Sequence, residues 1–288
     1  MRLRITHRTT YSYDAPVTYG LQQLRLTPKS RDGQSVLTWN IAVEGGTQQL
    51  TFEDQHANNV TLIGFDGESD SIVITSSGEV ETSDRSGVVG RHAGYAPLWY
   101  FRCATALTQG GNGVRGLAKG LNAEAPDPIA RMHALSARIA EAVTYTTGRT
   151  DARTTAEQAI AGREGVCQDH AHIFISAARM MGFPARYVSG YLKLDADLET
   201  SQDAAHGWAE AHIDGIGWIG FDVSNQISPD ERYVRVATGL DYTEAAPIHG
   251  MRYGDTAGES LSVDIEVHQD QYQQQSQGFG GQVQEQQQ

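Results

Sequence analysis

The first part of the chain alternates between apolar and polar positions. One alternating run is Leu3, Ile5, His7, Thr9, Tyr11 and Tyr13, and a second is Leu37, Trp39, Ile41 and Val43. A period of two is typical of half-buried β-strands, because successive side chains point to opposite faces of a sheet. Glycine-containing segments such as Asp32-Gly33 separate the runs at turn-like spacing. Residues 1–85 are therefore predicted to form an antiparallel β domain, either a sandwich or a barrel-like sheet.

The alternation weakens after residue 85, and a helical period replaces it further on. Five glycines crowd the segment from Gly110 to Gly120, so residues 86–125 are predicted to be an irregular, glycine-rich connection. Thr154 with Glu157 predicts a capping box that opens a short helix. A longer helix is predicted before it from a candidate N-cap, a proline in the first turn and an apolar stripe: Asp127, Pro128, Ile129, Met132, Leu135 and Ile139.

A further predicted helix begins at Cys167. The stripe Cys167, Ala171, Phe174 and Ala178 has helical spacing, which places the cysteine in the first turn on the inward side. Gly182 and Pro184 end this helix, and residues 186–192 read as a strand that follows it.

Two later strands are predicted to form a hairpin that carries His206 and Asp222. In an antiparallel pair, directly opposed residues share a face and their residue numbers sum to a constant. His206 and Asp222 can share a face only if that sum is even, which requires an odd number of loop residues. A three-residue loop over Asp214 to Ile216, with Gly217 free to adopt a left-handed conformation, meets this condition.

These three residues predict a nucleophilic triad. A thiol at a helix N-terminus experiences the positive end of the helix dipole, which favours the thiolate of Cys167. His206 would accept the thiol proton and later protonate a leaving amine, while Asp222 would fix the tautomer of the imidazole. On spacing alone, Cys167 could equally be a small buried residue and His206 a half-buried strand histidine.

Composition narrows the function classes. The formal net charge is −13 and no cluster of Lys and Arg appears, which argues against a nucleic-acid partner. The chain shows no apolar run long enough for a bilayer and no basic amphipathic stretch, so no membrane association is expected. Two cysteines exclude a disulfide framework, and a cytoplasmic location is expected. Residues 269–288 contain eleven glutamines and are predicted to be a disordered tail.

The residues around the triad also carry a family resemblance. GVCQDHAHIFISAARMMGFPARYVSGY resembles the cysteine motif of the transglutaminase-like superfamily, in its bacterial branch. HGWAEAHI and GWIGFD resemble the histidine and aspartate motifs of that family, in the same order and with similar spacing. The opening YSYDAPVTYGLQQLRLTP looks like the β domain that precedes the core in bacterial members.

The resemblance implies an α+β fold with a papain-like core, in which a nucleophile helix packs on an antiparallel sheet. It places the catalytic core at residues 126–268, after the mostly β N-terminal domain, and carries the catalytic roles onto Cys167, His206 and Asp222. It leaves the reaction open, because the superfamily includes amide cross-linkers, peptidases, glycan-releasing amidases and inactive members. The cross-linking enzymes of animals use an upstream tryptophan as oxyanion donor, and none lies between Trp99 and Cys167.

Four other residues are candidates for the site. Tyr145 could replace the missing tryptophan as oxyanion donor, together with the backbone N–H of Cys167. Asp169 lies in the first helical turn, where it would stabilise the helix dipole. His170 could line the cleft or serve a structural role, and Trp208 could form a wall beside His206.

A metal site is not expected. His170 and His172 are two residues apart on a helix, face different sides and cannot chelate one ion jointly with Cys167. No cofactor is expected either.

The predicted function is thiol-dependent hydrolysis of a peptide or carboxamide bond, with a peptide or protein as substrate. Two alternatives remain open: a transamidase, in which an amine resolves the acyl-enzyme, and an inert binding module of the same fold. Water is favoured as acceptor, because a cross-linking enzyme needs a dry acceptor tunnel, commonly built of tryptophans. This chain has only four tryptophans with which such a tunnel could be built: Trp39, Trp99, Trp208 and Trp218.

Overall fold

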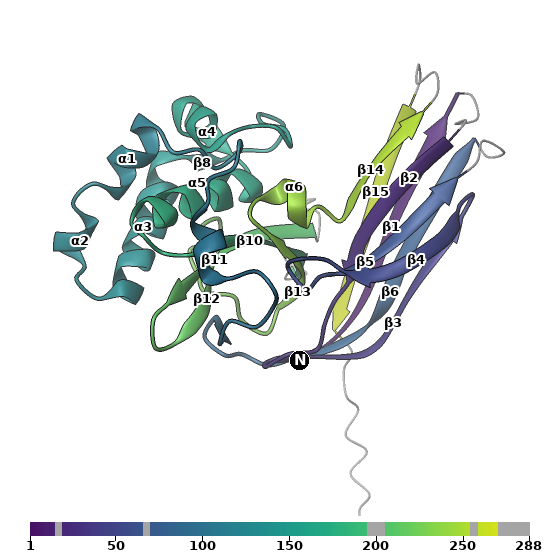
Figure 1. Cartoon of the computed structure of the whole chain (residues 1–288), viewed down its shortest axis with the longest axis horizontal. Coiled ribbons are helices and arrows are strands. Elements are labelled where there is room, and N and C mark those ends of the chain that lie inside the picture. The colour runs from purple at the N-terminus through teal and green to yellow at the C-terminus, as the bar shows by residue number, and fades with distance from the viewer. Residues whose placement is uncertain (15–18, 66–69, 195–204, 254–258, 270–288) are drawn as a thin grey trace, which may run out of the picture.

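A computed structural model describes residues 1–14, 19–65, 70–194, 205–253 and 259–269 of the 288-residue chain. The predicted glutamine-rich tail lies outside the described residues, except for Gln269. Figure 1 shows helices on one side, a central sheet in the middle and a second body of long strands on the other side. The alternating and helical periods of the sequence thus correspond to two different parts of the molecule, and the predicted α+β class is confirmed.

The long strands form a sandwich of two four-stranded antiparallel sheets, in the orders β15-β1-β6-β3 and β14-β2-β5-β4. In β1 the predicted alternation is confirmed, because Leu3 and Ile5 are fully buried whereas Arg4 is exposed. The sandwich interior contains Leu24, Leu26, Ile63, Phe65, Ile72 and Ile74. The strands are β1 (Arg2–Tyr13), β2 (Tyr19–Thr27), β3 (Gln34–Glu44), β4 (Thr47–Glu53), β5 (Asn59–Phe65), β6 (Ser71–Thr82), β14 (Ile248–Tyr253) and β15 (Glu259–Gln269).

The last two strands, β14 and β15, show that the core ends earlier than the predicted boundary at residue 268. β15 pairs with β1 from Leu3↔Gln269 to Tyr13↔Glu259, and β14 pairs with β2 from Ile248↔Leu24 to Tyr253↔Tyr19. Residues 248–269 therefore belong to the sandwich and not to the core that was expected over residues 126–268. The reason is non-local: β1 and β2 expose edges that only a partner can cover, and local periodicity does not reveal which strand covers them.

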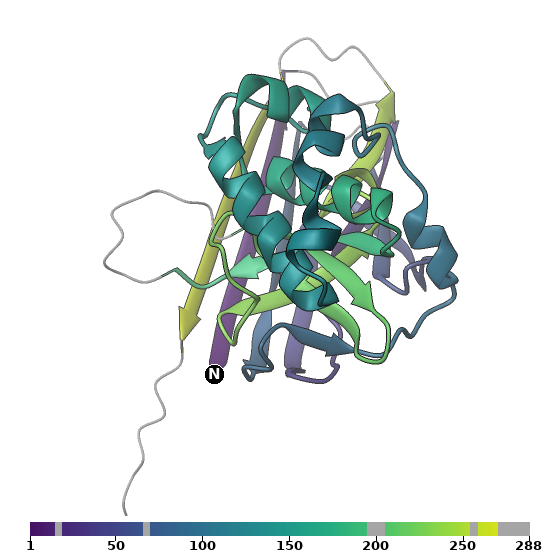
Figure 2. The same cartoon turned by 90° about the vertical axis from the view of Figure 1, so that its left-hand side faces the viewer.

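The second part is a five-stranded sheet, ordered β13-β10-β11-β12-β7 and antiparallel throughout. Its helices cover one face, as the turned view shows (Figure 2). The sheet strands are β7 (Val88–Gly90), β10 (Ala185–Leu192), β11 (Ala205–Ile213), β12 (Gly217–Phe221) and β13 (Tyr233–Gly239). The helices are α1 (Asn112–Ala118), α2 (Leu121–Glu124), α3 (Pro128–Ala142), α4 (Ala156–Gly162), α5 (Cys167–Met180) and α6 (Tyr242–Ala245), with the 3-10 turn η1 (Leu98–Arg102) and the short parallel pair β8 (Thr144–Tyr145) and β9 (Glu164–Gly165).

The glycine-rich segment 86–125 is not the irregular connection that the sequence predicts. It contributes β7 to the edge of the core sheet and two helices, in which Val114 and Leu121 are fully buried. Its glycines allow close packing: a Cβ at Gly111 would lie 2.8 Å from the Glu157 carboxyl carbon. That carboxylate accepts hydrogen bonds from the backbone N–H groups of Gly111, Gly113 and Val114, and so caps α1.

The predicted N-caps of α3 and α4 can be compared with the structure. Asp127 caps α3 as predicted, accepting from the Ala130 N–H at 2.8 Å. The predicted Thr154–Glu157 box is wrong by one residue, because the box consists of Thr155 and Gln158. Glu157 is unavailable to it, since its carboxylate binds the start of α1.

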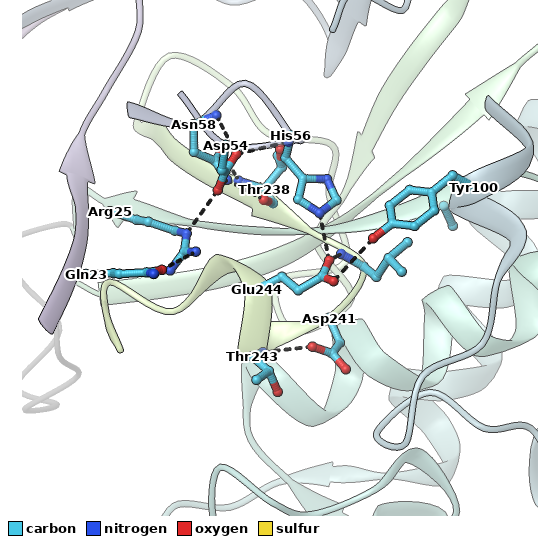
Figure 3. A network of polar contacts seen from close by, with 12 residues as sticks. Gln23, Arg25, Asp54, His56, Asn58, Tyr100, Thr238, Asp241, Thr243 and Glu244 are labelled. Atoms are coloured by element: carbon cyan, nitrogen blue, oxygen red, sulfur yellow. Dashed lines mark hydrogen bonds and ion pairs between the residues drawn. The ribbon is translucent and has the colours of Figure 1, made fainter. Parts of the chain in front are cut away.

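Polar contacts join the sandwich to the core at the turn between β4 and β5 (Figure 3). The Asn58 side chain pairs with both backbone groups of Thr238 in β13, at 2.7 and 2.8 Å. His56 contacts the Glu244 carboxylate at 2.7 Å, and Tyr100 donates to the same carboxylate. Apolar residues add to this junction, because Leu3 and Ile5 of the sandwich pack with Tyr191 and Val234 of the core sheet.

We predict that the sandwich requires its last two strands. A chain that ends at residue 247 leaves β1 and β2 as unpaired edges, and is expected to unfold at a lower temperature and to aggregate. A chain that ends at Gln269 keeps every described strand and serves as the control, with an unchanged melting temperature. Circular dichroism with light scattering measures both, and equal melting temperatures for the two truncations would show that β14 and β15 are dispensable.

Candidate active site

The helix that starts at Cys167 begins where the sequence predicts. Cys167 is the first residue of α5 and is partly exposed. Asp169 anchors the turn before it, because its Oδ2 accepts from the Val166 N–H at 2.8 Å and from the Thr150 hydroxyl at 2.7 Å. Gly165 makes room for this carboxylate, since a Cβ there would lie 2.8 Å from the Asp169 Cβ. Asp169 thus fixes the backbone at the start of α5. Burial of the carboxyl group raises the pKa of Asp169 despite these hydrogen bonds.

The hairpin register predicted from the even-sum rule is confirmed. Pairs from Ala209↔Phe221 to Ile213↔Gly217 leave a three-residue loop, and Gly217 has a φ of 108°. Every such pair sums to the same even number, so Asp222 lies opposite Trp208 and on the same face as His206. This register brings the imidazole and the carboxylate together.

His206 lies between Asp222 and Cys167. The distance from His206 Nε2 to Asp222 Oδ2 is 2.6 Å, so Nε2–H donates to the carboxylate. Cys167 lies close enough to the same ring for its hydrogen bonding and charge to act on the pKa of His206. Burial alone would lower the pKa of His206, but the hydrogen bond and charge of Asp222, with a further contribution from Cys167, raise it to about 10.

Asp222 is itself held by residues that the sequence reading missed. Its Oδ2 accepts from the Asn225 side-chain amide and from the Tyr233 hydroxyl, each at 2.7 Å. The carboxyl group is almost fully buried, which would raise its pKa, but the bonds from His206, Asn225 and Tyr233 lower the pKa overall. A polar turn three residues after Asp222 could have suggested Asn225, whereas Tyr233 comes from the distant β13 and carries no local signal.

Trp208 supports the imidazole from behind. Its indole is 3% exposed and lies nearly parallel to the His206 ring, with centroids 6.2 Å apart. The ring of Tyr233 packs edge-on against it at 5.4 Å. Trp208 therefore packs beneath the triad rather than lining an open cleft wall.

His170 is placed in a structural role. Its Nε2–H donates to the Val143 carbonyl at 2.9 Å, which leaves Nδ1 to accept from the Ser224 hydroxyl at 2.8 Å. Burial lowers its pKa, so the ring is neutral near pH 7. The same ring packs 6.2 Å from that of Tyr145.

A cavity of about 180 Å³ opens beside His206. Tyr145 of β8 lines it on one side, and Ser224 and Asn225, from the turn after Asp222, also line it. Tyr145 therefore lies at the same opening as the imidazole, where a substrate group could meet both.

Among the described residues, no group of three or more His, Cys, Asp or Glu side chains could hold a metal ion. In the same part of the chain, no helix is long and apolar enough to cross a membrane.

A helix that starts with a cysteine and packs on an antiparallel sheet bearing a histidine and an aspartate defines a papain-like α+β core. The chain belongs to the transglutaminase-like superfamily. Residues 115–223 match the model of the transglutaminase-like superfamily, and residues 3–81 match the bacterial transglutaminase-like N-terminal region. The recognition made from the cysteine, histidine and aspartate motifs is thereby confirmed.

Relatives of similar length occur in mycobacteria. An uncharacterised protein of Mycobacterium leprae is 30% identical, over 92% of this chain and 98% of that protein. An uncharacterised protein of Mycobacterium tuberculosis is 27% identical, over 92% of each chain. The crystal structure named "a Putative Cysteine Protease from Cytophaga hutchinsonii" superposes with a TM-score of 0.71 at 21% identity, and covers 93% of this chain and 90% of that one. That similarity shows the shared fold.

We predict that Asp222→Asn lowers the pKa of His206 from about 10 toward its ordinary value, because the mutation removes the neighbouring charge. The folded-state pKa of His206 is raised, so its contribution to stability is complete below pH 6.5 and is lost as the pH rises toward 10. The pKa of Asp222 is lowered, so its own contribution is complete above 3.8.

The difference in unfolding free energy between wild type and Asp222→Asn should therefore be largest between pH 3.8 and 6.5, and should shrink towards pH 10. Denaturant titrations across pH, with NMR titration of the His206 ring, measure both effects. Asp214→Asn is the matched control, since that carboxylate is exposed at the hairpin tip. An unchanged His206 pKa in Asp222→Asn would contradict the assigned coupling.

Proposed function

We propose that this protein is a thiol-dependent hydrolase of peptide or carboxamide bonds, acting through an acyl-enzyme on Cys167. The observation that carries the proposal is the placement of His206, with Nε2 bonded to a buried carboxylate and the thiol of Cys167 on the same ring. This arrangement pairs a nucleophile with a base whose orientation a third group fixes.

Acylation follows from that geometry. Because the pKa of His206 is raised to about 10, the imidazole already holds the proton of the thiol near neutral pH. The sulfur of Cys167 attacks the carbonyl carbon of the substrate to form a C–S bond. The C–N bond then breaks, and the imidazolium gives its proton to the departing amine. Asp222 remains ionised throughout and stabilises the imidazolium, as its lowered pKa requires.

The oxyanion of the tetrahedral intermediate needs donors. Cys167 is the first helical residue, so its backbone N–H has no partner within the helix. The Tyr145 hydroxyl belongs to a side chain that lines the cavity beside His206. We assign these two groups as the oxyanion donors, in place of the upstream tryptophan of cross-linking enzymes.

Water is the proposed acceptor in the second step. It attacks the thioester while His206 takes its proton, and the thiolate leaves with a carboxylic acid as product. Trp208 and Trp218 are almost fully buried, and Trp39 lies in the sandwich. Trp99 is 66% exposed on η1. These positions offer no tryptophan-lined tunnel that would exclude water while an amine enters.

A cytoplasmic location is part of the proposal. Both cysteines are free, and Cys103 is exposed, which suits a reducing compartment.

We predict that Cys167 reacts with iodoacetamide at mildly acidic pH much faster than an ordinary thiol, because His206 and the helix N-terminus favour the thiolate. The measurement uses a Cys103→Ser background, since that exposed thiol would otherwise contribute to the signal. Cys103→Ser with Cys167→Ala is the blank, and His206→Ala should slow alkylation. A rate equal to that of free cysteine would favour the inert binding module.

We further predict that hydrolysis of an acyl substrate outpaces transfer to millimolar primary amine. Release of acid and amide products is followed by mass spectrometry with glutaminyl and peptide substrates, in wild type and in Cys167→Ala. Tyr145→Phe is expected to lower kcat by about tenfold or more, if its hydroxyl binds the oxyanion. Amine incorporation that exceeds hydrolysis would make the protein a transamidase and overturn the choice of water.

A further inference from the structure

Cationic side chains gather where the sandwich meets the core sheet, on a chain whose net charge is −13. A cavity of about 480 Å³ lies at this junction. Its charged lining consists of Lys29, Arg31, Glu53, Arg91, Arg186 and Arg235. The lining thus holds five cations and one carboxylate, which is the reverse of the charge balance of the whole chain.

Two carboxylates at this junction are already engaged. Glu210 accepts from Arg186 at 2.6 Å and from Arg235 at 2.8 Å, and it is fully buried. Glu53 accepts from Lys29 at 2.5 Å. Glu210 thus binds two arginines and Glu53 binds the lysine. Arg31 is attracted by Asp32, which lies outside the lining of the cavity.

Among the arginines that line the cavity, Arg31 has guanidinium donors that the described residues leave without a hydrogen-bond partner. In the part of the chain that the structure describes, its Nε and Nη1 are buried without a hydrogen-bond partner. Burial, followed by repulsion from Arg235, lowers the pKa of Arg31 to about 9 despite the attraction of Glu210 and Asp32. A buried guanidinium with unpaired donors is costly unless something else pairs with it.

The structure holds this arginine firmly in place. The backbones of Arg31 and Gln34 bond to each other across a tight turn. The Gln34 side chain then binds both backbone groups of Arg235, at 2.8 and 2.9 Å. One arginine from each part of the molecule is therefore fixed at the same cavity, and such preorganised guanidinium groups suit planar or tetrahedral oxyanions.

The cavity is separate from the triad. None of Cys167, His206 and Asp222 lines it. Glu210, beneath its floor, is four residues from His206 along β11, which corresponds to about 13 Å. Its volume lies in the range of small-molecule sites.

We propose that this cavity, defined by Arg31, Arg91, Arg186 and Arg235, binds a small molecule that carries two or more negative charges on phosphate or carboxylate groups. The anion supplies the acceptors that Arg31 lacks and neutralises the excess charge at the junction. Because it contacts the sandwich and the core together, it also ties these two parts to each other. The site is independent of the thiol chemistry, and Cys167→Ala should bind the anion like wild type.

The test uses the full-length protein and two probes, inorganic pyrophosphate and citrate, in calorimetric titrations at constant pH and ionic strength. Constant ionic strength removes the unspecific contribution of screening. Wild type is expected to bind at least one probe saturably, with one site per chain. The stronger probe identifies phosphate or carboxylate as the preferred group.

Two variants locate the site. Arg31→Gln should weaken binding about tenfold or more, because it removes a charge-assisted donor pair. Arg91→Gln should weaken it as well, and this exposed side chain can be replaced without disturbing the fold. The matched control is Arg115→Gln on the exposed face of α1, with unchanged affinity. Absence of saturable binding, or equal affinity in Arg31→Gln, Arg91→Gln and the control, would overturn the proposal whatever the activity of Cys167.

Discussion

The register between β11 and β12 is the constraint on which the site depends. A loop of three residues, from Asp214 to Ile216, makes the paired residue numbers sum to an even value. A slip of one residue would move every side chain of β12 to the opposite face. The buried carboxylate of Asp222 would then lose His206, and an ionised group without a partner in the interior is strongly destabilising. The hairpin loop therefore controls both the chemistry and a large part of the local stability.

The same sheet face carries polar residues well beyond the triad. Ala209, Ala211 and Ile213 point toward the helices and pack in their core. The intervening Trp208 and Glu210 lie on the other face, where Trp208 packs with Tyr233 and Glu210 binds Arg235. One face of β11 is thus an ordinary apolar core, whereas the other combines the imidazole, its aromatic support and an ion pair. The sandwich side of the molecule reaches the core sheet through Gln34, whose side chain binds both backbone groups of Arg235.

Much of the site was readable from the sequence, because its parts are local. The start of α5 at Cys167, the strand after it and the hairpin parity follow from spacing and from glycine positions. The family resemblance then joined these segments. The residues that hold Asp222 show the limit, because Tyr233 comes from another strand and only the fold brings it there.

The wrong predictions of the fold have the same cause, because they depend on contacts between residues far apart in the chain. The glycines from Gly110 to Gly120 predicted an irregular connection, but they make room for the carboxylate of Glu157, which lies far along the chain. Strands β14 and β15 carry a pattern that suits any half-buried strand, so their partners β2 and β1 could not be inferred.

The pairing of β1 with β15 has a consequence for the order of events during synthesis. The first six strands leave the ribosome early, but their edge partners follow only after the 165 residues between Thr82 and Ile248. At roughly 5–20 residues per second, that interval is on the order of ten to thirty seconds. The core segment is synthesised before β14 and β15. It can therefore fold while the edges of β1 and β2 are still unpaired. The nascent chain therefore passes through a long interval in which β1 and β2 lack their native edge partners.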